Sequence, residues 1–287
     1  MTTLRAGCRL ILLVVLTLPL LIVQLVIFKF LPNWSGTIPV MFHRLSCKIL
    51  GVRVHLVGRQ LAPGPCLIVA NHASWLDISV LGSLRELSFV AKKEVAEWPI
   101  FGLFAKLQRC LFVDRDKRTA TEEFRKNMRE RLDHGDLLVL FPEGTSSDGN
   151  RVLPFKSALM SAAEVPVSDL LGGAVRSIKV QPISIAYTRL HGLPMGRQYR
   201  PYFAWYGDME ITPHIWEVMK LGPCDVTIHV HEAVTMEKIG NRKILAQYCE
   251  AKVKRGMLAA ILGRPIDEIA LMPAKETNST ILESTVK

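Results

Sequence analysis

The chain has 287 residues, enough for one large domain or for one domain with an anchor. Apolar residues make up 49% of it, and 36 Lys and Arg against 26 Asp and Glu give a net charge of +10. This balance predicts an anionic partner, such as a membrane surface, an acidic carrier protein or a nucleic acid. The six cysteines are scattered without a CxxC pair, which argues against a disulfide framework or a zinc site.

The first predicted element is an apolar helix long enough to cross a membrane. Residues 10–28 are apolar except for Thr17 and Gln24, which gives about 28 Å of helix. No good cleavage site follows, so we expect an anchor that is kept, not a signal peptide that is removed. Basic residues flank both ends and leave the orientation open, and Pro19 would kink the helix. A helix pair that dips into one leaflet is therefore an alternative to a true span.

Residues 38–50 mix apolar and basic side chains and predict an amphipathic helix at the membrane interface. The alternative is an ordinary surface helix packed on its own domain. The expected organisation is an anchor with an interfacial helix over residues 1–48, a main domain over 49–263, and a loose tail over 264–287, where periodicity is lost.

After residue 50, short apolar runs alternate with longer amphipathic runs, which is typical of an α/β domain. The expected fold is α/β, with a mixed but mostly parallel central sheet flanked by helices and an N-terminal hydrophobic membrane-anchoring helix. The predicted strands are 52–56, 66–70, 87–91, 110–113, 137–141, 180–186 and 226–230. The predicted helices are 75–84, 95–107, 121–132 and 242–262.

One stretch carries candidate chemistry. The strand that ends at Asn71 is followed by His72, and Ser74 with Asp77 forms a capping box that opens a helix. His72 is thus predicted at the carboxyl edge of the sheet, where α/β proteins bind ligands. Asp77 can reach back to the imidazole, fix its tautomer and stabilise the imidazolium, while a substrate alcohol takes the place of a protein nucleophile. The simpler alternative is that Asp77 only caps the helix and His72 is a turn residue.

Three further motifs follow at strand ends: 111–115 (LFVDR), 138–145 (LVLFPEGT) and 180–185 (VQPISI). The proline inside the third, Pro182, predicts an edge strand or a bulge. In this order, NHxxxxD, FxxR, FPEGT and VxPxxI resemble the four blocks of the lysophosphatidate acyltransferase (PlsC-like) family. The resemblance covers about residues 50–190.

The resemblance implies an acyltransferase domain and a membrane enzyme without cofactor or metal. The hydroxyl of a lysolipid would attack the thioester of acyl-CoA or of acyl carrier protein, with His72 and Asp77 as the catalytic dyad. General-base help of this kind is worth roughly 10²- to 10⁴-fold. The thioester oxygen needs hydrogen-bond donors in the transition state, and amides at the Ser74 helix start are candidates.

The resemblance also assigns residues to substrate binding. Arg115 would help to hold the polar head of the acceptor, and the FPEGT block would shape the acceptor site through Glu143, Gly144 and Thr145. Pro182 would lie on the acyl-chain side. The alternative is that Arg115 and Glu143 form one structural ion pair.

The sequence departs from the family at two positions. Ser146 stands where FPEGTR has arginine, and Arg109 stands where glycine is usual. Serine cannot bind phosphate as a guanidinium does, so both changes argue against a simple glycerol phosphate acceptor, although Arg151 or Lys156 could replace the missing arginine. Two later segments, 187–196 and 203–209, resemble the bacterial lyso-ornithine lipid acyltransferase branch. That branch esterifies the 3-hydroxyl of an amide-linked fatty acid on ornithine.

The expected function is therefore lyso-ornithine lipid O-acylation at the bacterial inner (cytoplasmic) membrane, with the active site on the cytoplasmic face. The alternative is a 1-acyl-sn-glycerol-3-phosphate acyltransferase that makes phosphatidic acid. The non-enzyme alternative is a basic membrane-bound lipid-binding protein; no nucleic-acid module is present, so no nucleic acid partner is expected. A serine hydrolase would need a GxSxG elbow, which is absent. His229 and His231 share a strand face, more often a polar face than a metal site.

Overall fold

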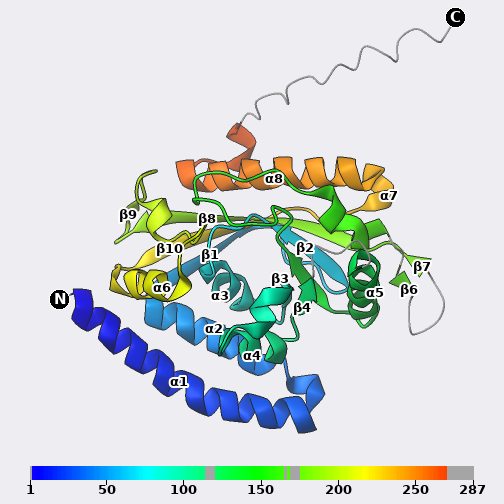
Figure 1. Ribbon diagram of the computed structural model, residues 1–287. Coiled ribbons are helices and arrows are strands. Elements are labelled where there is room, and N and C mark those ends of the chain that lie inside the picture. The colour runs from blue at the N-terminus through cyan, green and yellow to red at the C-terminus, as the bar shows by residue number, and fades with distance from the viewer. Residues whose placement is uncertain (1, 114–119, 165–166, 169–174, 270–287) are drawn as a thin grey trace, which may run out of the picture.

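The computed structural model describes residues 2–113, 120–164, 167–168 and 175–269. A mixed sheet lies between two layers of helices (Figure 1). Helices α2, α3 and α6 cover one face, and α5 and α8 cover the other. This confirms the expected α/β class with an apolar N-terminal helix.

The sheet runs in the order β1-β10-β8-β2-β5-β3-β4. All neighbouring strands on this path are parallel except β10 and β8, which are antiparallel. The carboxyl ends of β2, β5, β3 and β4 therefore meet at one edge. The bounds are β1 Val52–Gly58, β2 Cys66–Ala70, β3 Ser88–Lys92, β4 Leu111–Val113, β5 Leu137–Leu140, β8 Lys179–Leu190 and β10 Cys224–Val230.

All seven predicted strands are present. Four two-residue strands were not predicted: β9 Leu193–Pro194 and β11 Val234–Thr235 pair with β8, and β6 Val167–Ser168 pairs with β7 Val175–Arg176. The apolar run of β2 explains its central place. Ile68 faces the α3 layer and Leu67 faces the α8 layer, both fully buried, as expected for a parallel strand covered on two faces.

Pro182 does not mark an edge, because β8 pairs with β2 on one side and β10 on the other. It does lie at an irregularity, because the register on the second side moves by one residue between the pairs Ile183–Val230 and Val180–Val234. The ladder to β10 ends at the pair Ile183–Val230, and His231 N still donates to Pro182 O at 3.0 Å. A residue with a backbone N–H at position 182 would donate to His231 O. Because proline has no N–H, this oxygen accepts instead from Gln181 Nε2 at 3.0 Å. A side-chain amide thus replaces the donor that proline lacks.

The helices are α1 Thr2–Phe30, α2 Thr37–Leu50, α3 Leu76–Gly82, α4 Phe101–Leu107, α5 Ala120–Asp133, α6 Ile211–Lys220, α7 Met236–Ile239 and α8 Arg242–Leu262. The predicted helix over 95–107 is instead two pieces, a 3-10 turn at Lys93–Glu97 and α4. Pro99 separates them, and Ile100 after it has a positive φ of 66°. Helix α6 was not predicted.

Helix α1 packs against the domain along its length. Near its start, Arg9 donates to Met219 O at 2.9 Å and to Leu221 O at 2.7 Å, the end of α6. Near its end, Gln24 donates to Leu107 O at 3.1 Å, the end of α4. Its apolar surface is nevertheless mostly exposed: only 6% of its most apolar stretch of 18 residues is buried in the protein.

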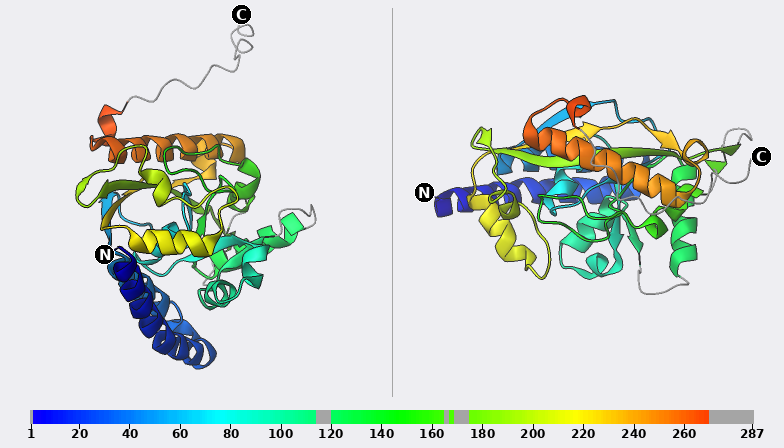
Figure 2. Two further views of the ribbon diagram at one scale, coloured as in Figure 1. Left: turned by 60° about the vertical axis from the view of Figure 1, so that its left-hand side comes forward. Right: turned by 90° about the horizontal axis from the view of Figure 1, so that it is seen from above.

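Helix α2 lies between α1 and α3, with His43, Cys47 and Leu50 turned inward. Figure 2 shows α1 and α2 side by side on the face opposite α8. The packing of α2 favours the surface-helix alternative over a free interfacial helix. At the other terminus Ile269 is buried, and residues 270–287 lie outside the described part of the chain, so the predicted limits of the domain stay predictions.

Candidate active site

The turn between β2 and α3 brings the predicted dyad together. His72 Nδ1 lies 2.9 Å from Asp77 Oδ2, and Asp77 is fully buried while the His72 side chain is 19% exposed. A carboxylate can only accept, so Nδ1 carries the proton. This leaves Nε2 as the nitrogen that can take a proton from a substrate.

One half of the predicted capping box is present, the bond from Ser74 N to Asp77, whereas the Ser74 hydroxyl bonds to Leu76 N and not to Asp77 N. Asp77 Oδ2 accepts from Ser74 N at 2.9 Å and from Ala73 N at 2.7 Å, and Ser74 Oγ accepts from Leu76 N at 3.3 Å. These amides at the helix start therefore serve the turn itself. The expectation that they stabilise the thioester oxygen is wrong for Ala73 and Ser74, because their N–H groups already donate to Asp77.

A second turn supports the first from the end of β5. Glu143 is buried, its Oε1 accepts from His72 N at 3.0 Å, and its Oε2 accepts from Leu153 N at 3.0 Å. The turn closes through Gly144 N to Phe141 O at 3.1 Å, and Gly144 has φ +74°, which suits glycine. Burial raises the pKa of Glu143 to about 8, although the two backbone donors lower it. Both of its oxygens thus accept from main-chain amides, and Oε1 holds the turn that carries His72.

Two residues next to the dyad escaped the sequence analysis. Phe141 stacks on the His72 imidazole, with ring centroids 4.1 Å apart and an interplanar angle of 17°, and so fixes the plane of the ring. Asn71 is buried and joins β2 to β8: its Nδ2 donates to Ile185 O at 2.9 Å and its Oδ1 accepts from Ile185 N at 2.8 Å. The one signal for Asn71 was its place in the NHxxxxD block.

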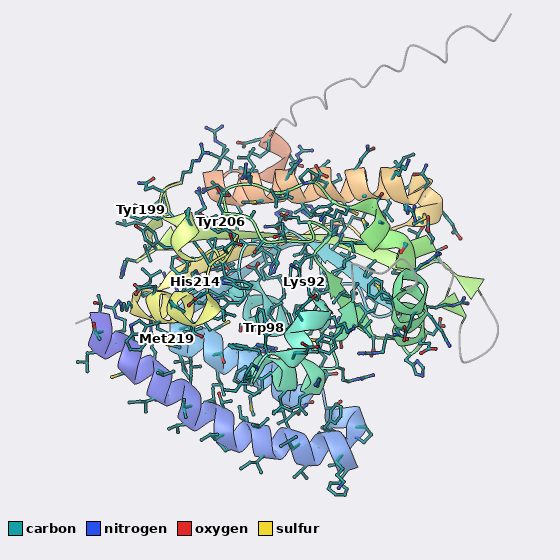
Figure 3. The ribbon with its side chains drawn as sticks, in the orientation of Figure 1. Lys92, Trp98, Tyr199, Tyr206, His214 and Met219 are labelled. Carbon is teal, nitrogen blue, oxygen red and sulfur yellow. The ribbon has the colours of Figure 1, made fainter. Side chains whose placement is uncertain are left out.

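The segment after β8 reaches the catalytic turn through main-chain contacts. Trp205 N donates to Ala73 O at 2.8 Å, and Ser146 Oγ donates to Trp205 O. The Trp98 ring meets the Trp205 ring edge to face at 6.0 Å, and Trp98 lies on the α3 side of the sheet (Figure 3). Ser146, in place of the family arginine, thus ties the 203–209 segment to the dyad.

The remaining predicted site residues are placed as follows. Thr145 is exposed, and Arg115 lies outside the described residues, as does its suggested ion pair with Glu143. The Arg151 side chain is 73% exposed and lies 3.9 Å from Asp148.

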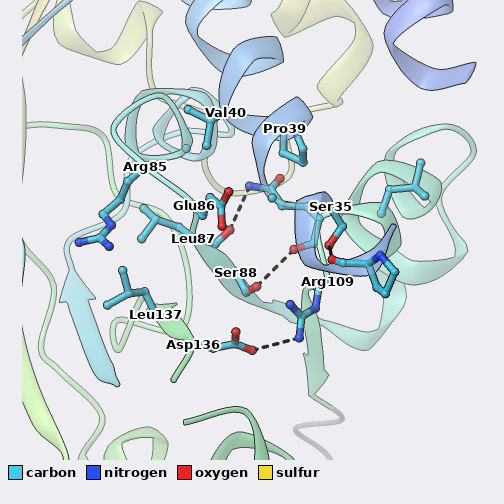
Figure 4. A pocket seen from close by; sticks show the side chains of 15 residues that line it. Ser35, Pro39, Val40, Arg85, Glu86, Leu87, Ser88, Arg109, Asp136 and Leu137 are labelled. Carbon is cyan, nitrogen blue, oxygen red and sulfur yellow. Dashed lines mark hydrogen bonds and ion pairs between the residues drawn. The ribbon is translucent and has the colours of Figure 1, made fainter. Parts of the chain in front are cut away.

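Arg109 belongs to the opposite edge of the sheet. It precedes β4 with φ +58°, and its guanidinium lies 3.4 Å from Asp136 (Figure 4). A cavity of about 250 Å³ opens here, beside the amino ends of β3 and β5 at Ser88 and Leu137. The expectation that Arg109 indicates the type of acceptor is therefore wrong, because Arg109 and His72 lie at opposite ends of the strands.

A model of the acyltransferase family matches residues 52–186. A lyso-ornithine lipid O-acyltransferase of Brucella abortus is 43% identical over 255 residues, which cover 89% of this chain and 94% of that protein. The chain belongs to the acyltransferase family. A second acyltransferase of the same name, from Rhizobium meliloti, is 41% identical over 79% of this chain and 77% of its own length.

A solved structure agrees with the fold of this acyltransferase. The 1-acyl-sn-glycerophosphate acyltransferase PlsC of Thermotoga maritima matches with a TM-score of 0.55 and 24% identity, over 87% of this chain and 96% of that one. The expected family is confirmed: the protein is an enzyme that transfers an acyl group from a donor to a lipid acceptor. Its exposed apolar helix α1 and this kinship indicate association with a membrane.

Proposed function

We propose that this acyltransferase esterifies the hydroxyl of lyso-ornithine lipid, with His72 as the general base and Asp77 as its orienting partner. The observation that carries the proposal is the 2.9 Å contact between His72 Nδ1 and the buried Asp77 carboxylate at the carboxyl edge of β2. The pair directs the basic Nε2 away from Asp77, where an acceptor hydroxyl can approach.

The proposed reaction is a single acyl transfer. The acceptor hydroxyl gives its proton to His72 Nε2 as its oxygen attacks the thioester carbonyl carbon. The tetrahedral intermediate then loses the C–S bond, and the departing thiolate takes the proton from Nε2. The imidazolium exists only between these steps, and Asp77 stabilises it through the Nδ1 hydrogen bond.

The choice of acceptor rests on Ser146. Its hydroxyl donates to Trp205 O, so this position offers neither charge nor a free donor to a phosphate. Both relatives described above carry the lyso-ornithine lipid name. Glycerol phosphate lysolipid stays the second candidate, because the PlsC enzyme shares the fold. In either case the FxxR arginine, Arg115, is proposed to hold the acceptor head together with the exposed Thr145.

The proposed location is the cytoplasmic face of the bacterial inner membrane, where acyl-CoA and acyl carrier protein are available. Residues 1–48 would form the anchor. Arg9 and Gln24, near opposite ends of α1, both bond to the same domain, which supports entry of α1 into one leaflet over a crossing of the bilayer. The positive net charge suits an acidic carrier protein as donor.

The test is a paired assay of purified enzyme in detergent, with labelled acyl carrier protein or acyl-CoA as donor. Lyso-ornithine lipid and lysophosphatidate are offered separately to wild type, to Ser146→Arg and to Gln60→Arg, an added charge on an exposed loop away from the dyad. We expect wild type to prefer lyso-ornithine lipid and Ser146→Arg alone to shift the ratio toward lysophosphatidate, roughly tenfold. A wild-type preference for lysophosphatidate would refute the acceptor and leave the acyltransferase intact.

A further inference from the structure

Tyr187 reaches the proposed dyad from the far side of Asp77. It lies on β8, its side chain is buried, and its hydroxyl donates to Asp77 Oδ1 at 2.7 Å. Its ring stacks on Phe203 at 5.8 Å with an interplanar angle of 18°, which fixes the direction of the O–H. Tyr187 is the first residue of the segment 187–196 noted in the sequence, but none of the four family blocks includes it.

The two oxygens of Asp77 are held by different parts of the fold. Oδ2 accepts from His72, Ala73 and Ser74, all within the catalytic turn. Oδ1 accepts from Tyr187, 110 positions away on the sheet. The bond to Tyr187 therefore ties the Asp77 carboxylate directly to the sheet, in addition to the contacts that Glu143 and Trp205 make with the backbone of the turn.

The hydroxyl of Tyr187 keeps its proton. Burial raises its pKa well above the usual value, and the neighbouring Asp77 charge raises it further. A hydroxyl that stays protonated donates at every working pH, so the carboxylate always shares part of its negative charge with this bond.

We propose that Tyr187 is a positioning residue of the transferase reaction: its hydroxyl fixes the Asp77 carboxylate and moderates the negative charge that faces His72. This rests on the dyad proposed above, though not on the identity of the acceptor. A charge-assisted hydrogen bond to one carboxylate oxygen lowers the proton affinity of the whole group. Its removal leaves more negative charge on the Asp77 oxygen that faces His72, and so changes how strongly the carboxylate stabilises the imidazolium.

Other titratable groups face this cluster. Glu143 accepts a hydrogen bond from His72 N, and burial raises the pKa of Glu143 to about 8. Cys47 of α2 and Cys224 of β10 adjoin Tyr187. Burial raises the pKa of both thiols, that of Cys47 to about 12, so both stay neutral. None of these three groups titrates on the acid limb of the rate profile.

The test is the pH profile of kcat/KM for full-length enzyme with Tyr187→Phe, using whichever donor and acceptor wild type turns over. We expect kcat to fall roughly tenfold and the acid limb to move up by about half a pH unit. Phe203→Leu removes the stacking and keeps the hydroxyl, so it lowers kcat without moving the limb. Tyr199→Phe, on an exposed ring remote from Asp77, leaves both unchanged.

A double-mutant cycle with Asp77→Asn completes the test. If Tyr187 acts through Asp77, its replacement costs much less kcat in the Asp77→Asn background than in wild type. Equal costs in the two backgrounds, or a Tyr187→Phe enzyme with an unmoved acid limb, would overturn the proposal. If the proposed dyad itself were wrong, the result would differ: the His72→Ala enzyme would be fully active.

Discussion

Two histidines in this sheet have a polar partner at almost the same distance. His72 Nδ1 lies 2.9 Å from Asp77 at the carboxyl end of β2, and His231 Nε2 lies 2.8 Å from Ser184 Oγ just after β10. His231 is 6% exposed beneath α8, and burial together with its neighbours His229 and Lys252 lowers its pKa to about 3. The His72 side chain is more open and has a carboxylate as partner.

The difference shows what a base requires beyond a close partner. Ser184 Oγ donates to Val253 O at 2.9 Å, so it must accept from His231, whose Nε2 therefore carries the proton. His231 therefore has no negatively charged partner that could stabilise an imidazolium. His72 donates a hydrogen bond to Asp77 from its protonated Nδ1, and its basic Nε2 stays available to a substrate. His231 joins sheet to helix, and His72 is placed for proton transfer.

Replacement of the two histidines should separate these roles most strongly. We expect His72→Ala to lower kcat by about 10⁴-fold, because the general base is lost. His231→Ala should keep wild-type kcat per folded molecule and lose stability. Steady-state rates, normalised by the fraction folded from circular dichroism, give the comparison. Similar losses of kcat in both variants would contradict it.

Asp77→Asn isolates the charge that His231 lacks. The amide oxygen can still accept from Ala73 and Ser74, and the amide NH₂ can donate to Tyr187, so the turn keeps its shape. We expect kcat to fall about 10²-fold with an unchanged melting temperature. An equally large loss of stability would mean that Asp77 acts as a helix cap, the simpler alternative from the sequence.

The turn after β5, which holds the backbone of His72, contains a group that titrates near neutrality, whereas the His231 pair does not. Burial raises the pKa of Glu143 to about 8, above its unfolded value, so its contribution to stability is lost as pH rises toward and through 8. Between pH 6 and 9 wild type should lose on the order of 3 kcal/mol that Glu143→Gln does not lose. Urea unfolding at both pH values measures this. Parallel curves for the two proteins would show that Glu143 is ionised throughout.

Ser184→Ala tests the structural side of the comparison. It leaves His231 Nε2 and Val253 O without this partner in the core, which should cost about 1–3 kcal/mol in the free energy of unfolding. The kcat of the folded enzyme should not change. A loss of activity at wild-type stability would assign the buried pair to function.

Phe141→Leu should have the smallest effect. It removes the ring that stacks on the His72 imidazole and keeps an apolar side chain, so we expect kcat to fall only a few fold, consistent with about 1 kcal/mol for an aromatic pair. The acid limb of the pH profile should stay in place, because Asp77 is untouched. A shift of that limb would mean that the ring, too, tunes the proton affinity of His72.

Local sequence determined a large part of this protein. The seven main strands, helix α8 and the capping bond from Ser74 N to Asp77 follow from apolar runs and turn residues whose partners lie close in the chain. The dyad was predictable for the same reason, since four residues separate His72 from Asp77 and one helical turn brings them together.

Only the tertiary structure decided the rest, because it depends on which strands become neighbours. Pro182 suggested an edge strand, yet β8 lies in the middle of the sheet. The Gln181 side-chain amide donates to His231 O, the oxygen to which proline cannot donate. Tyr187 reaches Asp77 only because β8 pairs with β2. Contacts across so many residues leave no periodic trace in the sequence. The local sequence therefore specified the proposed base and its carboxylate, and the folded sheet supplied the hydroxyl that holds the carboxylate.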